Sequence, residues 1–279
     1  MNIGIIGLGL IGGSLGLDLR AQGYQVLGVS RQEQTCQRAI ERGVVDDAST
    51  NLTLLAAADV VFICTPIGMI APTVERLVPH LSPDTVITDV GSVKAVVVEQ
   101  VTPLWHNFVG GHPMAGTAES GIEAAVSGLF AGNPYVLTPI ENTPAPAVKL
   151  LEEIVRSLTS GLYFCRPEDH DRAVAWISHL PVMVSASLID ACMSEADPTV
   201  LELAQQLASS GFRDTSRVGG GNPELGLMMA RYNRASLLRS LLSYRHSLDQ
   251  IIELIEQENW QSLQKRFQQT QSHRPPFVS

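Results

Sequence analysis

The feature that most constrains the fold is a run of spaced glycines near the start of the chain. Residues 7–12 read Gly-Leu-Gly-Leu-Ile-Gly and match G-x-G-x-x-G, between an apolar strand-like segment at 2–6 and an apolar helical segment at 11–21. Gly7 permits a tight turn, Gly9 lets the backbone approach a pyrophosphate, and Gly12 lets helix and strand pack closely. The helix N-terminus adds N–H donors and a favourable dipole. The sequence therefore predicts a dinucleotide site formed by Gly7, Leu8, Gly9, Leu10, Ile11 and Gly12.

The first half of the chain alternates short apolar runs with helical stretches. The predicted strands are 2–6, 24–29, 60–64, 86–88, 107–110, 135–138 and 162–165, and the predicted helices are 11–21, 32–42, 70–78 and 147–158. Nearly continuous apolar strands separated by helices indicate a parallel sheet that is covered on both faces. Residues 139–146 resemble a linker, but a helix and a strand follow them, so we place the domain boundary near Arg166.

Strand signals disappear after Glu168. Apolar residues recur at helical spacing in 173–193, 200–208 and 225–255, while the tail 271–279, with two adjacent prolines, is not expected to be helical. The stretch 225–255 is apolar on more than one face and must be buried on more than one side. We therefore expect an α/β protein with two domains. Residues 1–165 form a Rossmann-type, mostly parallel sheet domain, and residues 166–279 form an all-helical domain that pairs two subunits.

Composition excludes several classes of protein. The chain is 45% apolar and carries a net charge of -9, so it is globular and a poor binder of nucleic acid or membrane surfaces. Its four cysteines are scattered without the spacing of a metal site, and no metal is expected. No signal peptide or run of about 18 apolar residues is recognised. A cytoplasmic location is expected.

The end of the second predicted strand indicates which dinucleotide is bound. NAD-binding proteins usually carry an acidic residue about 20 residues after the glycines, which holds the ribose hydroxyls. This chain has Ser30 and Arg31 there, a hydroxyl and a guanidinium that suit a 2′-phosphate. The pattern favours NADP over NAD. Cys64, Thr65 and Pro66 end the third predicted strand and are expected to line the same cofactor site.

A second informative string surrounds a histidine. Residues 109–116 read Val-Gly-Gly-His-Pro-Met-Ala-Gly and start at the carboxyl end of a predicted strand, where ligands bind in open α/β sheets. Glycines before His112 and a proline after it suggest that an exposed loop holds this imidazole in place for use as a base. Upstream, residues 89–94 close another strand and offer Ser92 as a hydroxyl partner.

At this point the chain resembles the prephenate/arogenate dehydrogenase family of tyrosine biosynthesis. The resemblance rests on the glycine fingerprint, residues 89–94, His-Pro-Met-Ala-Gly-Thr at 112–117, Ser-His-Leu-Pro at 178–181 and Gly-Phe-Arg-Asp-Thr-Ser-Arg at 211–217. It implies that His112 is the base, that Ser92 is its partner and that His179 and Thr117 contact the substrate. It also implies a carboxylate clamp at Arg217, a position for which Arg213 competes.

The resemblance further implies a reaction. A ring hydroxyl is oxidised, hydride passes to the nicotinamide, and the ring carboxylate leaves as carbon dioxide. Many family members that prefer prephenate carry an acidic residue directly after the string that ends at Thr117, whereas this chain has Ala118 and then Glu119. Together with Ser30 and Arg31, this favours arogenate, giving tyrosine, over prephenate, giving 4-hydroxyphenylpyruvate.

Two other functions would also use the glycine fingerprint. The 3-hydroxyacid dehydrogenases share the two-domain plan but use a lysine on a helix after the cofactor domain, and Lys94, Lys149 and Lys265 are not in such a position. A non-catalytic NADP sensor would need the fingerprint but neither His112 nor the arginine clamp. We therefore expect a homodimeric enzyme with a small-molecule substrate, NADP, and neither a nucleic-acid nor a membrane partner.

Overall fold

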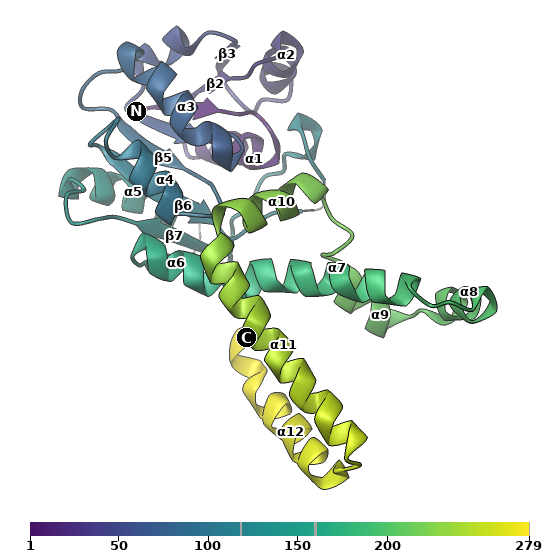
Figure 1. The fold of residues 1–279 in the computed structure, drawn as a ribbon. Helices are drawn as coiled ribbons and strands as arrows, with labels where there is room; N and C mark the ends of the chain where they lie inside the picture. Colours follow the sequence, from purple (N-terminus) through teal and green to yellow (C-terminus); the bar gives the residue numbers. More distant parts are fainter. Residues whose placement is uncertain (118, 159–160, 279) are drawn as a thin grey trace.

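The computed structural model describes residues 1–117, 119–158 and 161–278, whose strands form one sheet of eight (Figure 1). The strands are β1 (Asn2–Ile6), β2 (Gln25–Val29), β3 (Asp47–Ser49), β4 (Val60–Ile63), β5 (Val86–Asp89), β6 (Phe108–Pro113), β7 (Pro134–Thr138) and β8 (Gly161–Phe164). They are ordered β3-β2-β1-β4-β5-β6-β7-β8. Neighbours from β3 to β6 are parallel, β7 is antiparallel to β6, and β8 is parallel to β7. The predicted mostly parallel sheet is confirmed.

Helices cover both faces of the sheet, as the continuous apolar strands require. They are α1 (Leu10–Ala21), α2 (Glu33–Glu41), α3 (Ile67–Leu77), α4 (Ala95–Val101) and α5 (Ala145–Ser157), with 3-10 turns at η1 (Leu52–Ala57), η2 (Val78–His80) and η3 (Ile122–Ala124). Ile5 of β1 packs in one buried cluster with Leu15 of α1, and Ile6 packs in the other with Ile70 of α3. Alternate residues of one strand therefore enter two different cores.

The strand order reverses between β1 and β4, and this reversal positions the cofactor site. The chain runs outward from β1 through β2 to β3 and then crosses back to β4. Gly7 N–H donates to Val29 O at 2.9 Å, and Cys64 N–H donates to Ile6 O at 2.7 Å. The carboxyl ends of β1, β2 and β4 thus meet at the switch point where ligands bind in open α/β sheets.

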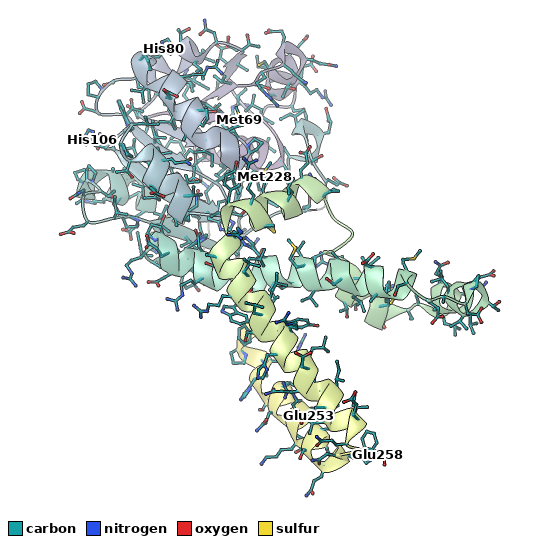
Figure 2. All side chains as sticks on the ribbon, viewed as in Figure 1. Met69, His80, His106, Met228, Glu253 and Glu258 are labelled. Atoms are coloured by element: carbon teal, nitrogen blue, oxygen red, sulfur yellow. The ribbon has the colours of Figure 1, made fainter. Side chains whose placement is uncertain are left out.

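The second half of the chain is helical in the described residues. It contains α6 (Pro167–Val174), the π-helical segment η4 (Ala175–His179), α7 (Leu180–Met193), α8 (Pro198–Leu207), α9 (Ser210–Ser216), α10 (Pro223–Tyr232), α11 (Arg234–Glu256), α12 (Trp260–His273) and the turn η5 (Pro275–Phe277). α10 returns to the sheet domain, where Tyr232 lies against Gly68 of α3. α11 and α12 form a hairpin that projects away from the sheet, with Glu253 and Glu258 at its far end (Figures 1 and 2).

The helical half differs from the sequence prediction in two places. The single long helix expected over residues 225–255 is two helices, because Asn233 leaves the helical conformation between α10 and α11. The tail is helical as far as His273, so the prediction of a non-helical tail from 271 is wrong for its first residues. α9 and α12 were not predicted, since short or mostly polar helices lack a clear apolar stripe.

One described helical stretch, Pro167–Met193, is long and apolar enough by length and composition to cross a membrane. A helix packed inside a protein passes the same test. Here the stretch carries Asp171, whose side chain accepts hydrogen bonds from the start of α4 in the sheet domain. Only 28% of the most apolar part of the stretch is buried, and one such helix is weak evidence for a membrane.

Candidate active site

The glycine turn has the geometry that a dinucleotide requires. Gly7 has φ of +100°, and a Cβ there would come within 2.5 Å of Cys64 O. A Cβ on Gly12 would collide with the carbonyl oxygen of Gly7, whereas one on Gly9 would meet no atom within 4 Å. Gly9 directly precedes α1 and provides no side-chain cap, so the first N–H groups of the helix are available to an anion. The turn therefore fits a pyrophosphate that approaches Gly9.

The residues expected to choose the cofactor lie at the same edge of the sheet. Ser30 is partly buried just after β2, and Arg31 is exposed beside it. Cys64 and Thr65 are partly buried after β4, and Pro66 is the residue before α3. Thr65 Oγ1 is buried without a hydrogen-bond partner in the described part of the chain. Burial and the nearby carboxylate of Asp89 raise the pKa of the Cys64 thiol, so it stays protonated.

His112 lies in a strand and is buried, so the prediction of an exposed loop is wrong. β6 continues through Pro113, and His112 pairs with Val136 of β7. Only 8% of His112 is exposed. The glycines before it do not end the strand. They allow close packing, because a Cβ on Gly111 would lie 2.7 Å from Asp89 O.

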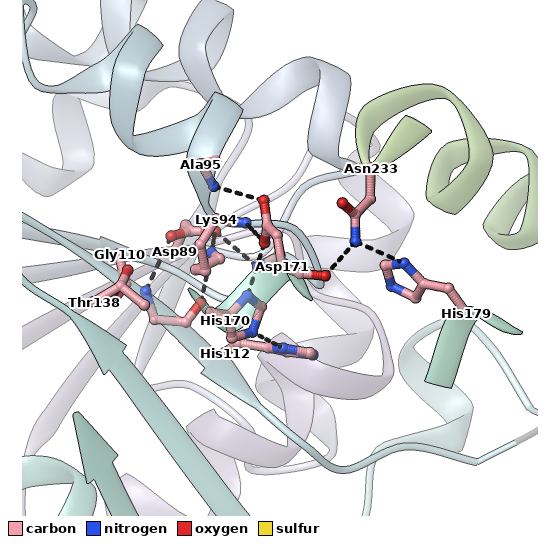
Figure 3. Close-up of polar contacts among 12 residues, drawn as sticks. Asp89, Lys94, Ala95, Gly110, His112, Thr138, His170, Asp171, His179 and Asn233 are labelled. Atoms are coloured by element: carbon pink, nitrogen blue, oxygen red, sulfur yellow. Dashed lines mark hydrogen bonds and ion pairs between the residues drawn. The ribbon is translucent and has the colours of Figure 1, made fainter. Parts of the chain in front are cut away.

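A chain of hydrogen bonds extends from His112 into the helical half (Figure 3). His112 Nδ1 lies 2.8 Å from His170 Nε2, and His170 Nδ1 lies 2.8 Å from Asp171 Oδ1. Asp171 in turn accepts from Lys94 N at 2.7 Å and from Ala95 N at 2.9 Å. A carboxylate at a helix N-terminus satisfies free N–H groups and interacts favourably with the helix dipole. Asp171 therefore joins α6 to α4 and supports His112 through His170.

A buried ion pair lies beside this chain. Lys94 Nζ donates to Asp89 and, at 2.7 Å, to Gly111 O, and both charged side chains are fully buried. Asp89 also accepts from Gly91 N at 2.8 Å and Gly111 N at 3.1 Å. Burial lowers the pKa of Lys94, and Asp89 opposes that shift. The pair connects β5 to the backbone directly before His112.

The surroundings of His112 favour its neutral form. Burial lowers its pKa well below the ordinary value, and His170, Lys94 and His179 lower it further. A neutral imidazole can accept a proton at pH 7, which is what a general base must do. The position and electrostatics of His112 therefore suit the predicted chemistry.

Ser92 Oγ and His179 Nε2 are, like Thr65 Oγ1, among the buried polar atoms that have no hydrogen-bond partner in the described residues. The expected bond between Ser92 and His112 is therefore not formed. His179 lies at the end of η4, and π-helical turns are frequent at functional sites. Burial lowers the pKa of His179 to about 4. Since buried polar groups are rarely left unpaired, the two atoms mark a place for polar groups of a ligand.

The remaining predicted substrate residues are exposed. Arg213 pairs with Asp214 at 3.5 Å, and Arg217 follows α9 with its side chain in solvent. Thr117 is also exposed, and its hydroxyl accepts from Glu119 N at 3.2 Å. Within the described ranges, no hydrogen bond or ion pair joins these residues to His112. Ala118, used above to favour arogenate, lies outside the described residues.

Sequence reasoning missed four polar residues of the site, His170, Asp171, Asn233 and Lys94. His170 and Asp171 follow two acidic residues in the first turn of α6, where such residues are common on a solvated helix start. Asn233 lies within residues 225–255, which were predicted as one helix, and it stands in no recognised motif. Lys94 was passed over although it is one of three lysines and stands in a recognised motif, a signal that was available.

The chain was compared with known families and structures. Residues 15–163 match the family model described as "Prephenate dehydrogenase, nucleotide-binding domain", and residues 166–269 match "Prephenate dehydrogenase, dimerization domain". The prephenate dehydrogenase of Bacillus subtilis is 32% identical over 97% of this chain and 74% of its own length.

Two solved structures are similar over nearly the whole chain. Synechocystis arogenate dehydrogenase is 55% identical, with a TM-score of 0.90 and complete coverage of both chains. Prephenate dehydrogenase from A. aeolicus, in complex with hydroxyphenyl propionate and NAD+, is 27% identical, with a TM-score of 0.92 and coverage of 98% of this chain and 97% of that one.

Proposed function

The chain belongs to the prephenate dehydrogenase family, and we propose that it converts arogenate to tyrosine by oxidative decarboxylation, with NADP as the cofactor. The observation that carries this proposal is a buried His112 with a lowered pKa on the sheet domain that bears the glycine turn, and the unpaired Ser92 Oγ and His179 Nε2 support it. The similarity to Synechocystis arogenate dehydrogenase supports arogenate. Ser30 and Arg31, without a carboxylate at the end of β2, support NADP.

Prephenate is the second candidate substrate, giving 4-hydroxyphenylpyruvate. Relatives named prephenate dehydrogenase support it, and one of them, from A. aeolicus, binds NAD+. The two substrates differ in the side chain, which is a keto acid in prephenate and an amino acid in arogenate. Both carry the ring hydroxyl and ring carboxylate on which the reaction depends, so the same base serves either one.

The residues have separate tasks in this proposal. His112 accepts the proton of the ring hydroxyl, and Ser92 and His179 bind substrate oxygens with their unpaired polar atoms. Arg217, with Arg213 as the alternative, grips a carboxylate in two places, as a guanidinium can. The glycine turn would hold the dinucleotide, whose nicotinamide would supply the hydride acceptor. Burial of His112 keeps water away from the reacting atoms.

The test is reduction of NADP or NAD, followed by absorbance in the near ultraviolet. Arogenate, prephenate and a 3-hydroxyacid are supplied separately to the purified enzyme. We expect the highest kcat/KM with arogenate and NADP and no reduction with the 3-hydroxyacid. A preference for prephenate would replace the substrate proposal by its alternative, and equal use of NAD would contradict the role given to Ser30 and Arg31.

We further propose that the enzyme is a cytoplasmic homodimer joined through its helical half, as the match to a dimerization domain supports. On α11, Leu237 is buried while the adjacent Leu238 is exposed, so one face of the helix packs and another is open. Large exposed apolar residues on the helical half include Leu203, Leu207, Leu227, Leu242, Ile252, Trp260 and Phe267. Sedimentation at micromolar concentration should give twice the chain mass, and a single 30.1 kDa species would exclude the dimer.

A further inference from the structure

Asp171 lies where the two halves of the molecule meet and is the origin of two hydrogen-bond chains. Its side chain leads through His170 to His112. Its backbone carbonyl leads through Asn233 to His179. Figure 3 shows both chains, which end on two imidazoles of the candidate site. Hydrogen-bond direction can be followed along each chain, because carboxylate and carbonyl oxygens only accept hydrogen bonds.

The side-chain route determines which nitrogen of His112 carries the proton. The Asp171 carboxylate accepts N–H bonds from Lys94 and Ala95, so the remaining bond must be donated by His170 Nδ1. A neutral His170 then has a lone pair on Nε2, which accepts from His112 Nδ1–H at 2.8 Å. A neutral His112 whose proton is on Nδ1 has a bare Nε2, the atom that can act as a base.

The carbonyl route gives the opposite result for His179. Asn233 Nδ2 lies 2.7 Å from Asp171 O and must be the donor there. The same amide nitrogen lies 3.2 Å from His179 Nδ1, to which its second hydrogen is donated. Since Nδ1 accepts, the proton of neutral His179 is on Nε2. That nitrogen is buried and has no partner in the described residues, so it can donate to a ligand oxygen.

We propose that Asp171, through His170 and Asn233, holds the two site histidines in opposite tautomers, His112 as a proton acceptor at Nε2 and His179 as a hydrogen-bond donor at Nε2. The catalytic meaning rests on the proposed function, whereas the tautomers are properties of the protein alone. His170, Asp171 and Asn233 are positioning residues, because each acts through another side chain. Each imidazole then presents one defined nitrogen, an acceptor on His112 and a donor on His179.

The hydrogen bonds from His112 through His170 to Asp171 also stabilise the charge formed in the reaction. The hydroxyl O–H bond breaks, a new N–H bond forms at His112 Nε2, and the oxygen electron pair forms a C=O bond as hydride leaves the carbon, for which a bound nicotinamide would be the acceptor. The imidazolium so formed is bonded through Nδ1–H to His170 and thence to Asp171. The other charged or titratable groups around it are Lys94, Asp89 and His179. Lys94 is paired with Asp89, so the Asp171 carboxylate is available to balance the new charge.

Protonation of His170 would reverse the arrangement. A cationic His170 donates from both nitrogens, so His112 Nδ1 would have to accept and its proton would move to Nε2. His112 could then no longer act as a base.

Nuclear magnetic resonance of the unaltered protein tests the tautomers directly. The enzyme is labelled with 15N at its seven histidines, and ring nitrogen shifts are recorded near pH 7.5 without substrate or cofactor. We expect a protonated Nδ1 and bare Nε2 for His112, and a protonated Nε2 and bare Nδ1 for His179. The reverse pattern at either ring would overturn the proposal, whatever substrate the enzyme uses.

Substitutions test the consequence for activity. His170→Leu removes the acceptor from His112 and should lower kcat about 10- to 100-fold, the usual effect of losing a group that orients an active imidazole. Its KM should change little. His170→Gln should restore part of that loss, because the glutamine carbonyl can accept from His112 Nδ1–H. His106→Gln, at an exposed histidine of the sheet domain, is the matched control and should behave as wild type (Figure 2).

Asn233→Leu tests the hydrogen bonds to His179 separately from those to His112. It should raise KM and leave the His112 ring signals as in wild type, while the proton of His179 becomes distributed over both nitrogens.

Equal kcat in His170→Leu and wild type, with unchanged His112 signals, would contradict the proposal. If a variant fails to fold, the wild-type ring signals still decide. The enzyme could show the expected tautomers and yet be inactive on both arogenate and prephenate. That result would reject the proposed function but would still support the tautomers proposed here.

Discussion

The two halves of the molecule differ in how completely they bury their apolar residues. In the sheet domain, side chains such as Ile3, Phe62 and Ile87 are fully buried between strands and helices of the same chain. In the helical half, Leu207 and Leu227 are 70% and 68% exposed. Large exposed apolar surfaces indicate sites of protein association. The exposed apolar residues of the helical half are where the proposed partner subunit would pack.

The halves also differ in what they contribute to the site. The sheet domain contributes backbone geometry at the glycine turn and the imidazole of His112, each at the carboxyl edge of the sheet. The helical half contributes His179 and the residues that hold both imidazoles, His170 and Asp171 among them. Neither half forms the site alone, so their packing decides the chemistry. The comparison suggests tests that separate cofactor binding, proton transfer and substrate binding.

The largest effect is expected for His112, the proposed proton acceptor of the sheet domain. His112→Asn keeps a polar side chain but loses the imidazole, so turnover should fall about 10²- to 10⁴-fold, the usual contribution of a general base. Substrate and NADP affinity should change far less, because the lost interaction matters mainly in the transition state. His80→Gln, at an exposed histidine, is the control for steady-state kinetics. Near-normal turnover in His112→Asn would remove this residue from the mechanism.

A smaller effect is expected for the arginines of the helical half. Arg217→Ala should remove a charged hydrogen bond to a substrate carboxylate and raise KM by the equivalent of about 1.5–3 kcal/mol. kcat and NADP affinity should be nearly unchanged. Arg213→Ala is the matched comparison, because Arg213 is also exposed and pairs with Asp214. A larger rise of KM in Arg213→Ala would assign the clamp to that residue instead.

The preference for NADP over NAD should depend on residues of the sheet domain alone. Ser30→Asp places a carboxylate against the 2′-phosphate and should weaken NADP binding by about 1.5–3 kcal/mol while improving NAD binding. The KM of the substrate should not move, because Ser30 lies at the end of β2 and away from the helical half. Fluorescence titration with each dinucleotide measures the effect. Unchanged NADP affinity would show that another residue recognises the 2′-phosphate.

The smallest effect is expected on stability in acid. His179 has a pKa of about 4 in the folded protein against an ordinary 6.5, and the pKa of His112 is also lowered. The unfolded chain therefore binds protons that the folded chain does not as pH falls from 6.5 towards 4. Stability should be complete above 6.5 and fall by up to about 1.4 kcal/mol per pH unit for each histidine below it.

Urea unfolding at several pH values measures this dependence. His179→Gln should flatten the dependence between pH 6.5 and 4, and His80→Gln should leave it as in wild type. The same slope in His179→Gln and wild type would show that His179 is not the group responsible.

Much of the fold could be predicted from local patterns. The glycine fingerprint, the apolar strands and the change to helical spacing after Glu168 each depend on neighbouring residues. The direction of β7 could not be predicted in this way, because a short antiparallel strand that is covered on both faces has the same apolar pattern as a parallel one. The break at Asn233 was also missed, since its flanking segments share one apolar period.

What the sequence by itself determined is the set of backbone requirements and the family. Gly7 and Gly12 predict the dinucleotide turn because a Cβ would collide with backbone there, and Gly9 because it leaves room for a pyrophosphate. The strings around His112 and His179 identify the family. Tertiary structure alone decided that His112 is buried in a strand and that His170 supports it. The bond between Asp171 and Lys94 spans 77 residues, so no local pattern contains it. Such contacts arise only when α6 packs against α4, and burial there gives each hydrogen bond its directing effect.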